Sequence, residues 1–220
     1  TTILNHPNFG WAVQAKDMLP VKKLYLFELY NGHPSVRNFG DPKHPSTEEL
    51  WDDLLTQGMT IYGVGSDDAH HFGQWNSGKS NPGRGWVMVR AKELTSDAIT
   101  NAMTQGDFYA SSGVMLKKVI RGPKHIEVEV DETATDKELA SPILYGRKVK
   151  EGKPGYLVEF IGPKGKVIES SDKTKASSPV NLPYLRCKVT RRLKQTDGTL
   201  LEYYAWVQPV FTDGRVKSLK

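Results

Sequence analysis

The first half of the chain alternates predicted strands with predicted helices. Dense apolar runs, typical of strands covered on both faces, occur at residues 1–5, 23–29, 60–65 and 85–90. Ser46 stands three residues before Glu49 and forms a capping box for a helix that ends at Gly58. A second helix is expected within residues 95–106. This order predicts a parallel α/β architecture.

The second half has a different period. Apolar and polar residues alternate one by one in residues 126–130 and again in 185–189. The turn at 162–164 predicts a hairpin, and the apolar run 203–211 contains Pro209, which favours an edge strand. We therefore predict an antiparallel β-sandwich accessory domain in this half.

Charge changes at the same place. Residues 1–116 carry 9 Lys and Arg against 12 Asp and Glu, a net charge of −3, whereas residues 117–220 carry 21 against 13, a net charge of +8. We predict two domains with these bounds, joined by a linker near residues 111–115. A basic surface can face polyanions, but we favour the alternative of a solvated lysine-rich β surface, and nucleic acid is not expected as a partner.

Other features set limits on the class of protein. No run approaches the length of about 20 apolar residues that spans a bilayer. The single cysteine, Cys187, excludes an intrachain disulfide and leaves the compartment open, with a preference for a periplasmic or secreted location. The chain begins without Met inside an apolar run, which suggests a fragment of a longer protein.

Residues with metal-ligand and acid–base chemistry follow the ends of the predicted strands. They are His6, then Glu28, Asn31 and His33, then Asp67, Asp68, His70 and His71. The carboxyl ends of parallel strands form the rim where β/α barrels build active sites. We therefore expect these side chains to converge.

Asp68 and His70 are the strongest candidates among them. In extended backbone, residues two apart point the same way, and a carboxylate with an imidazole suits Zn²⁺, Mn²⁺ or Fe²⁺. Spacing alone leaves the alternative of a capping Asp and a surface His open. For His6 the alternative is a turn residue before proline, and for Glu28 it is a salt bridge.

Residues 73–80, GQWNSGKS, match the phosphate-loop pattern. That mechanism needs a strand directly before the loop and a helix directly after it, and residues 81–85 (NPGRG) cannot start a helix. We therefore predict a long loop over the rim, with Lys79 and Arg84 facing an anionic substrate, and no nucleotide binding.

The first half resembles the PHP superfamily (polymerase and histidinol phosphatase type metal-dependent phosphoesterases), in its carbaryl-hydrolase-like branch. The matching segments are NHP at 5–7, FELYNG at 27–32, GVGSDDAH at 63–70 and residues 84–113. The resemblance implies a distorted seven-stranded TIM-like (β/α)7 barrel with two or three divalent metal ions. It implies that His6, Asp68 and His70 are metal ligands, and that Glu28 and Asn31 lie beside them.

The chain departs from that family at its beginning. The opening H-x-H motif of the family is absent, and about four of the seven barrel strands are present. We therefore expect residues 1–116 to be the C-terminal portion of the barrel. The rest of the barrel would be supplied by a missing N-terminal segment of the same protein. The alternative, which we favour less, is that the chain is a degenerate remnant of the barrel.

The resulting prediction is a metal-dependent hydrolase of phosphate esters, or of a related aryl ester or carbamate, acting on a small or polymeric substrate. Metal-activated water would react, with Asp68 and His70 at the catalytic centre. Glu28, Asn31, Lys79 and Arg84 would bind substrate. The alternative is a catalytically inactive scaffold whose β-sandwich recognises a polymer or a protein.

Overall fold

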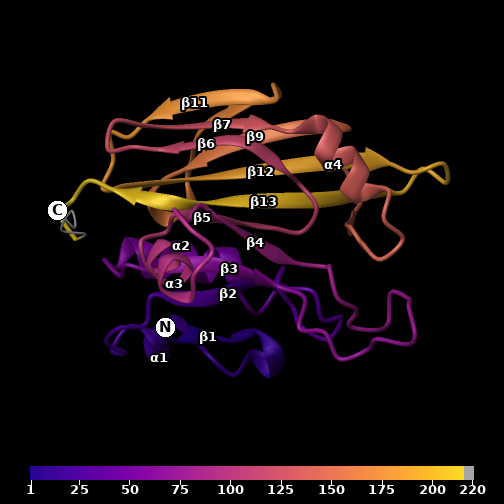
Figure 1. Cartoon of the computed structure of the whole chain (residues 1–220), viewed down its shortest axis with the longest axis horizontal. Coiled ribbons are helices and arrows are strands. Elements are labelled where there is room, and N and C mark those ends of the chain that lie inside the picture. The colour runs from indigo at the N-terminus through magenta and orange to yellow at the C-terminus, as the bar shows by residue number, and fades with distance from the viewer. Residues whose placement is uncertain (216–220) are drawn as a thin grey trace.

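The computed structural model describes residues 1–215, in which three β-sheets lie in layers (Figure 1). The indigo and purple sheet of the N-terminal part lies at the bottom of the view, the long yellow strands cross the middle, and a smaller sheet lies at the top. Within the described residues, no helix combines the length and the apolar character that crossing a bilayer requires.

The bottom sheet is parallel. It consists of β1 (Ile3–Leu4), β2 (Leu26–Asn31) and β3 (Tyr62–Ser66), in that order. The short helices η1 (Phe9–Trp11) and α1 (Ala15–Met18) lie between β1 and β2, and α2 (Thr47–Thr56) joins β2 to β3. The predicted capping box of α2 is confirmed, because Ser46 Oγ accepts from the Glu49 amide and the Glu49 carboxylate accepts from the Ser46 amide.

The central sheet is antiparallel and has the strand order β10-β9-β12-β13-β5-β4, with β8 also paired to β13. Its strands are β4 (Trp86–Val89), β5 (Phe108–Ser111), β8 (Arg147–Val149), β9 (Gly155–Ile161), β10 (Val167–Ser171), β12 (Tyr184–Lys194) and β13 (Leu200–Phe211). Helix α3 (Ser96–Thr104) joins β4 to β5, and η2 (Pro163–Gly165) turns the chain from β9 to β10. Strands from both halves of the chain share this sheet, and the division at residue 116 stays a prediction.

The top sheet covers the other face of the central sheet. It has the order β11-β7-β6, formed by β6 (Leu116–Arg121), β7 (His125–Val130) and β11 (Lys175–Pro179), and α4 (Glu132–Leu139) follows β7. The apolar members of the alternation in β7, Ile126 and Val128, are fully buried in one core with Phe160 and Cys187 of the central sheet. The period of two thus places one face of each strand in this core.

The expected TIM-like (β/α)7 barrel is wrong. The described part of the chain is mostly β, with four α-helices and no closed barrel. The fourth expected barrel strand exists as β4, but it pairs antiparallel with β5 instead of lying parallel beside β3. The parallel sheet therefore ends after three strands.

The free edge of β3 shows why the sheet ends there. The side-chain amide of Gln208 in β13 behaves like a strand backbone: its Nε2 donates to the Gly63 carbonyl oxygen at 2.7 Å, and its Oε1 accepts from the Gly63 amide at 2.9 Å. Farther along, a Cβ atom on Gly65 would lie 2.7 Å from the Trp86 carbonyl oxygen, so β4 meets β3 in backbone contact. One glutamine side chain thus satisfies backbone groups that a fourth parallel strand would otherwise pair.

The edge position predicted from Pro209 is also wrong, because β13 lies between β12 and β5. However, β5 pairs only with residues 205–207 of β13. Beyond them, the Arg121 guanidinium donates to the carbonyl oxygens of Gln208 and Pro209 at 3.1 and 2.8 Å. At Pro209, which has no N–H to donate, the neighbouring carbonyl oxygens on this side of β13 are therefore bonded by an arginine side chain instead of by a strand.

A buried ion pair fixes α2 against the central sheet. Arg186 of β12 is 1% exposed, and its Nε and Nη2 donate to the two carboxylate oxygens of Asp52 at 2.7 and 2.6 Å. Its guanidinium also lies 5.0 Å from the centre of the Trp51 ring and 3.5 Å from the carboxylate of Glu48. Burial alone would raise the pKa of Glu48, but Lys188 and Arg186 outweigh it and lower that pKa.

We expect Asp52→Asn to lower the free energy of unfolding by about 3–5 kcal/mol, because it leaves a buried guanidinium without its main carboxylate. Asp53→Asn, one residue along the same helix, is the matched control. Asp53 is exposed and bonds only to Gln57, so its change is expected to stay within about 0.5 kcal/mol. Urea denaturation followed by circular dichroism measures both values, and equal losses would contradict the role given to Asp52.

Candidate functional site

The carboxyl ends of the three parallel strands bring the predicted residues to one edge of the bottom sheet. The buried carboxylate of Glu28, in β2, accepts from the backbone N–H of His6 at 2.7 Å. The same oxygen, Oε2, accepts from Asn31 Nδ2 at 2.8 Å. The ends of β1 and β2 are thus joined through one carboxylate, and the alternative of a salt bridge for Glu28 does not occur among the described residues.

A second set of contacts leads from Asn31 to the D-x-H run. Asn31 Oδ1 accepts from the His33 amide at 2.8 Å, and the His33 ring meets the His70 ring edge-on, with 5.5 Å between centroids. His70 Nδ1 lies 2.6 Å from the carbonyl oxygen of Asp68 and 3.8 Å from its carboxylate. Contacts therefore connect the ends of β2 and β3, as the predicted convergence requires.

The Asp68 carbonyl has a chemical consequence for His70. A carbonyl oxygen only accepts, so Nδ1 carries the hydrogen in that contact, and in a neutral imidazole Nε2 then keeps its lone pair. Histidine ligands of metals commonly donate their other N–H to a backbone carbonyl in this way. Asp68 adopts a left-handed φ of 49°, so its backbone is not extended there. We had expected the two side chains to point the same way because the backbone would be extended. That reason does not apply to this backbone.

The expectation of a metal-binding group within this chain is contradicted for the described residues. Within residues 1–215, no group of three or more His, Cys, Asp or Glu side chains is placed so that it could hold a metal ion. His6 contributes its backbone N–H to the site, while its ring packs edge-on against Phe9 at 5.6 Å. Asp68 and His70 are donors of the right type, but they are only two.

The loop after His70 is held from inside by two buried side chains. The Arg84 guanidinium donates to the carbonyl oxygens of Lys79 and Asn76 and to Asn81 Oδ1. Asn81 Nδ2 donates to two further carbonyls of the loop, at 2.8 Å each. Carbonyl oxygens thus point inward, the reverse of the inward N–H groups of a phosphate loop, and no helix follows before α3. The predicted long loop is present, and the absence of nucleotide binding stays a prediction.

Lys79 and Arg84, which we predicted to face an anionic substrate, differ in burial and in their contacts. Lys79 contributes its carbonyl to Arg84, and its side chain is half-buried. Arg84 is 4% exposed, stacks 4.5 Å from the ring centre of Tyr145 and holds the loop. Substrate contact by either side chain stays a prediction.

A cavity of about 280 Å³ opens beside Asn31 and His33. Its far wall comes from the second half of the chain, which the sequence did not connect with the site: Tyr145, Arg147, Glu202 and Tyr204. One signal was present, because Glu202 is a carboxylate within an apolar strand. The pairing that brings this strand to the site had no local signal.

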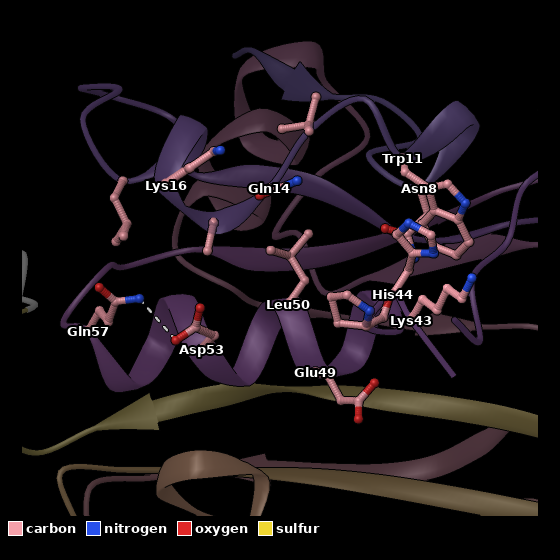
Figure 2. Close-up of a pocket in the computed structure, with 14 residues that line it drawn as sticks. Asn8, Trp11, Gln14, Lys16, Lys43, His44, Glu49, Leu50, Asp53 and Gln57 are labelled. Atoms are coloured by element: carbon pink, nitrogen blue, oxygen red, sulfur yellow. Dashed lines mark hydrogen bonds between the residues drawn. The ribbon is translucent and has the colours of Figure 1, made fainter. Parts of the chain in front are cut away.

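A larger cavity, of about 500 Å³, lies between α2 and residues 8–19 (Figure 2). Figure 2 shows Trp11 and His44 at one end and Gln57, bonded to Asp53, at the other. The Trp11 and His44 rings are stacked, with 4.2 Å between centroids. None of its described lining residues is a predicted site residue, so this cavity stands apart from the strand-end chemistry.

We expect Asn31→Asp to destabilise the protein in a pH-dependent way, because it places a second carboxylate beside the buried carboxylate of Glu28. Two adjacent buried carboxylates repel each other while both are ionised, which we expect to destabilise the folded state by about 3 kcal/mol. The loss of stability relative to the unchanged protein should therefore be present at about pH 7.5 and shrink toward about pH 5, as protonation relieves the repulsion.

Urea unfolding at both pH values tests this expectation. Asn101→Asp, on an exposed turn of α3, makes the same chemical change without a buried neighbour and should have little effect at either pH. A loss for Asn31→Asp that does not depend on pH would contradict the proximity to Glu28.

The chain matches no family model, no curated protein and no solved structure. The resemblance to PHP phosphoesterases therefore stays a prediction that rests on the motifs alone.

Proposed function

We propose that this edge of the bottom sheet is part of a hydrolytic site that uses a divalent metal ion, acting on phosphate esters or on a related aryl ester or carbamate. The observation that supports it best is the continuous set of contacts from His6 through Glu28 and Asn31 to His33, His70 and Asp68. Polar groups of this kind, gathered from three strand ends, are typical of catalytic edges in α/β proteins.

The residues divide into two roles in this proposal. The Asp68 carboxylate and the free Nε2 of His70 would hold the ion, and Zn²⁺, Mn²⁺ or Fe²⁺ accept such donors. Further ligands would have to come from outside residues 1–215, because the described residues supply too few. When bound, such an ion lowers the pKa of a coordinated water and polarises the ester. Glu28 and Asn31 position the strand ends and the His33 backbone.

The experiment is a comparison of His70→Ala with His71→Ala in the complete protein that carries this chain, so that the further ligands are present. His71 is the neighbouring imidazole, but its Nδ1 faces Ser80 inside the loop. Bound metal is measured by elemental analysis, and turnover with a generic phosphomonoester, phosphodiester and aryl ester. We expect His70→Ala to lose metal and at least about a hundredfold in kcat/KM, and His71→Ala to stay within a few-fold.

Two results would contradict the proposal. One is that the unchanged protein neither binds metal nor hydrolyses any of the three substrates, which would favour the binding or scaffold alternative. The other is that His71→Ala is as defective as His70→Ala, which would mean that the loop, and not the imidazole of His70, carries the effect.

A further inference from the structure

The cavity beside Asn31 and His33 contains two guanidinium groups from different parts of the chain. Arg84 comes from the loop after β3, and Arg147 begins β8. Arg147 lies 4.2 Å from the ring centre of Phe39, and Arg84 stacks on Tyr145. Aromatic faces thus hold both cations in place at the wall of one cavity, which we call the two-arginine pocket.

Neither arginine has a carboxylate partner. Among residues 1–215, every ion pair within 4 Å involves other side chains. Arg84 is nearly buried, its contacts are neutral carbonyl and amide oxygens, and its Nε has no hydrogen-bond partner. Burial lowers the pKa of Arg84, and the hydroxyls of Tyr145 and Tyr30 offset only part of that effect. A buried cation without a counterion costs free energy that an anion would recover.

The one carboxylate in the pocket does not supply that counterion. Glu202 Oε1 accepts from Nε and Nη2 of Arg192, and Oε2 accepts from the hydroxyl of Tyr204. Arg192 therefore balances the charge of Glu202, and the pocket keeps an excess of positive charge. Ser112 and His33 also line it.

We propose that the two-arginine pocket binds the oxyanion group of a small molecule, a carboxylate or a phosphate, with Arg147 as the accessible contact. Because guanidinium forks match the geometry of both groups, the shared chemistry is a planar or tetrahedral oxyanion. Where the proposed hydrolase function holds, this anion is a non-reacting group of the substrate, anchored beside the strand ends. The second half of the chain would then take part in substrate selection.

The test measures binding without catalysis. The full chain, treated with EDTA, is titrated with inorganic phosphate and separately with acetate at constant ionic strength, and backbone amides are followed by NMR. We expect saturable shifts at Ser112 and Gly146, which line the pocket, for at least one of the two anions. Saturation by phosphate alone identifies a phosphate group as the ligand chemistry, and saturation by acetate identifies a carboxylate.

Arg147→Met is expected to raise the dissociation constant at least about tenfold, and Arg147→Lys to have an intermediate effect. Arg191→Met is the matched control, because Arg191 also stacks on an aromatic ring, that of Tyr156 at 4.6 Å, but lies outside the pocket. Its dissociation constant should change by no more than about twofold. Arg147 is exposed, so these variants should keep the amide spectrum of the folded protein.

Two results would overturn the proposal: no saturable binding of either anion, or binding that Arg147→Met and Arg191→Met weaken equally. Failure of the hydrolase proposal gives a different result. In that case the protein lacks turnover, while anion binding in EDTA and its loss in Arg147→Met remain.

Discussion

The ion pair between Arg186 and Asp52 is the contact on which the arrangement of the layers depends. It joins a helix of the parallel sheet to the centre of the antiparallel sheet, across 134 residues of sequence. Both carboxylate oxygens accept from one guanidinium, and the Trp51 ring lies beside it. Such a bidentate pair is directional, so it specifies how α2 sits on β12, whereas apolar contacts alone would tolerate sliding.

The apolar contacts around this pair merge the two halves. Phe27 of β2 and Leu54 of α2 are fully buried in one cluster with Tyr204 and Trp206 of β13. The parallel sheet is therefore covered by a strand that appears at the end of the chain. The change of pattern near residue 116 is real in the sequence, but the core extends across it.

Local features of the fold could be predicted from the sequence, because their causes are local. The Ser46 cap, the buried runs and the alternation in residues 125–130 each depend on neighbouring residues. The pairing of residues 86–89 could not be predicted in this way. An apolar run fits a parallel or an antiparallel neighbour equally well. Here the edge of β3 beside Gly63 is occupied by the Gln208 side chain, and Trp86 packs closely against Gly65; neither contact can be read from the local sequence.

The same distinction applies to the candidate site. Its strand-end residues follow from chain order, since parallel strands place their carboxyl ends together. The wall formed by Arg147 and Glu202 follows from long-range pairing: β8 pairs with residues 200–202 of β13, and β13 in turn pairs with β5. A shift of β13 by one residue would turn Glu202 and Tyr204 to the other face of the sheet. The bidentate pair at Arg186 and the amide bridge at Gln208 both anchor the long β12–β13 hairpin to the parallel sheet. Two polar contacts outside the two-arginine pocket thus help to hold it beside His33. For this reason, the pairing of β8 with β13 places residues of the antiparallel sheet in the wall of this pocket.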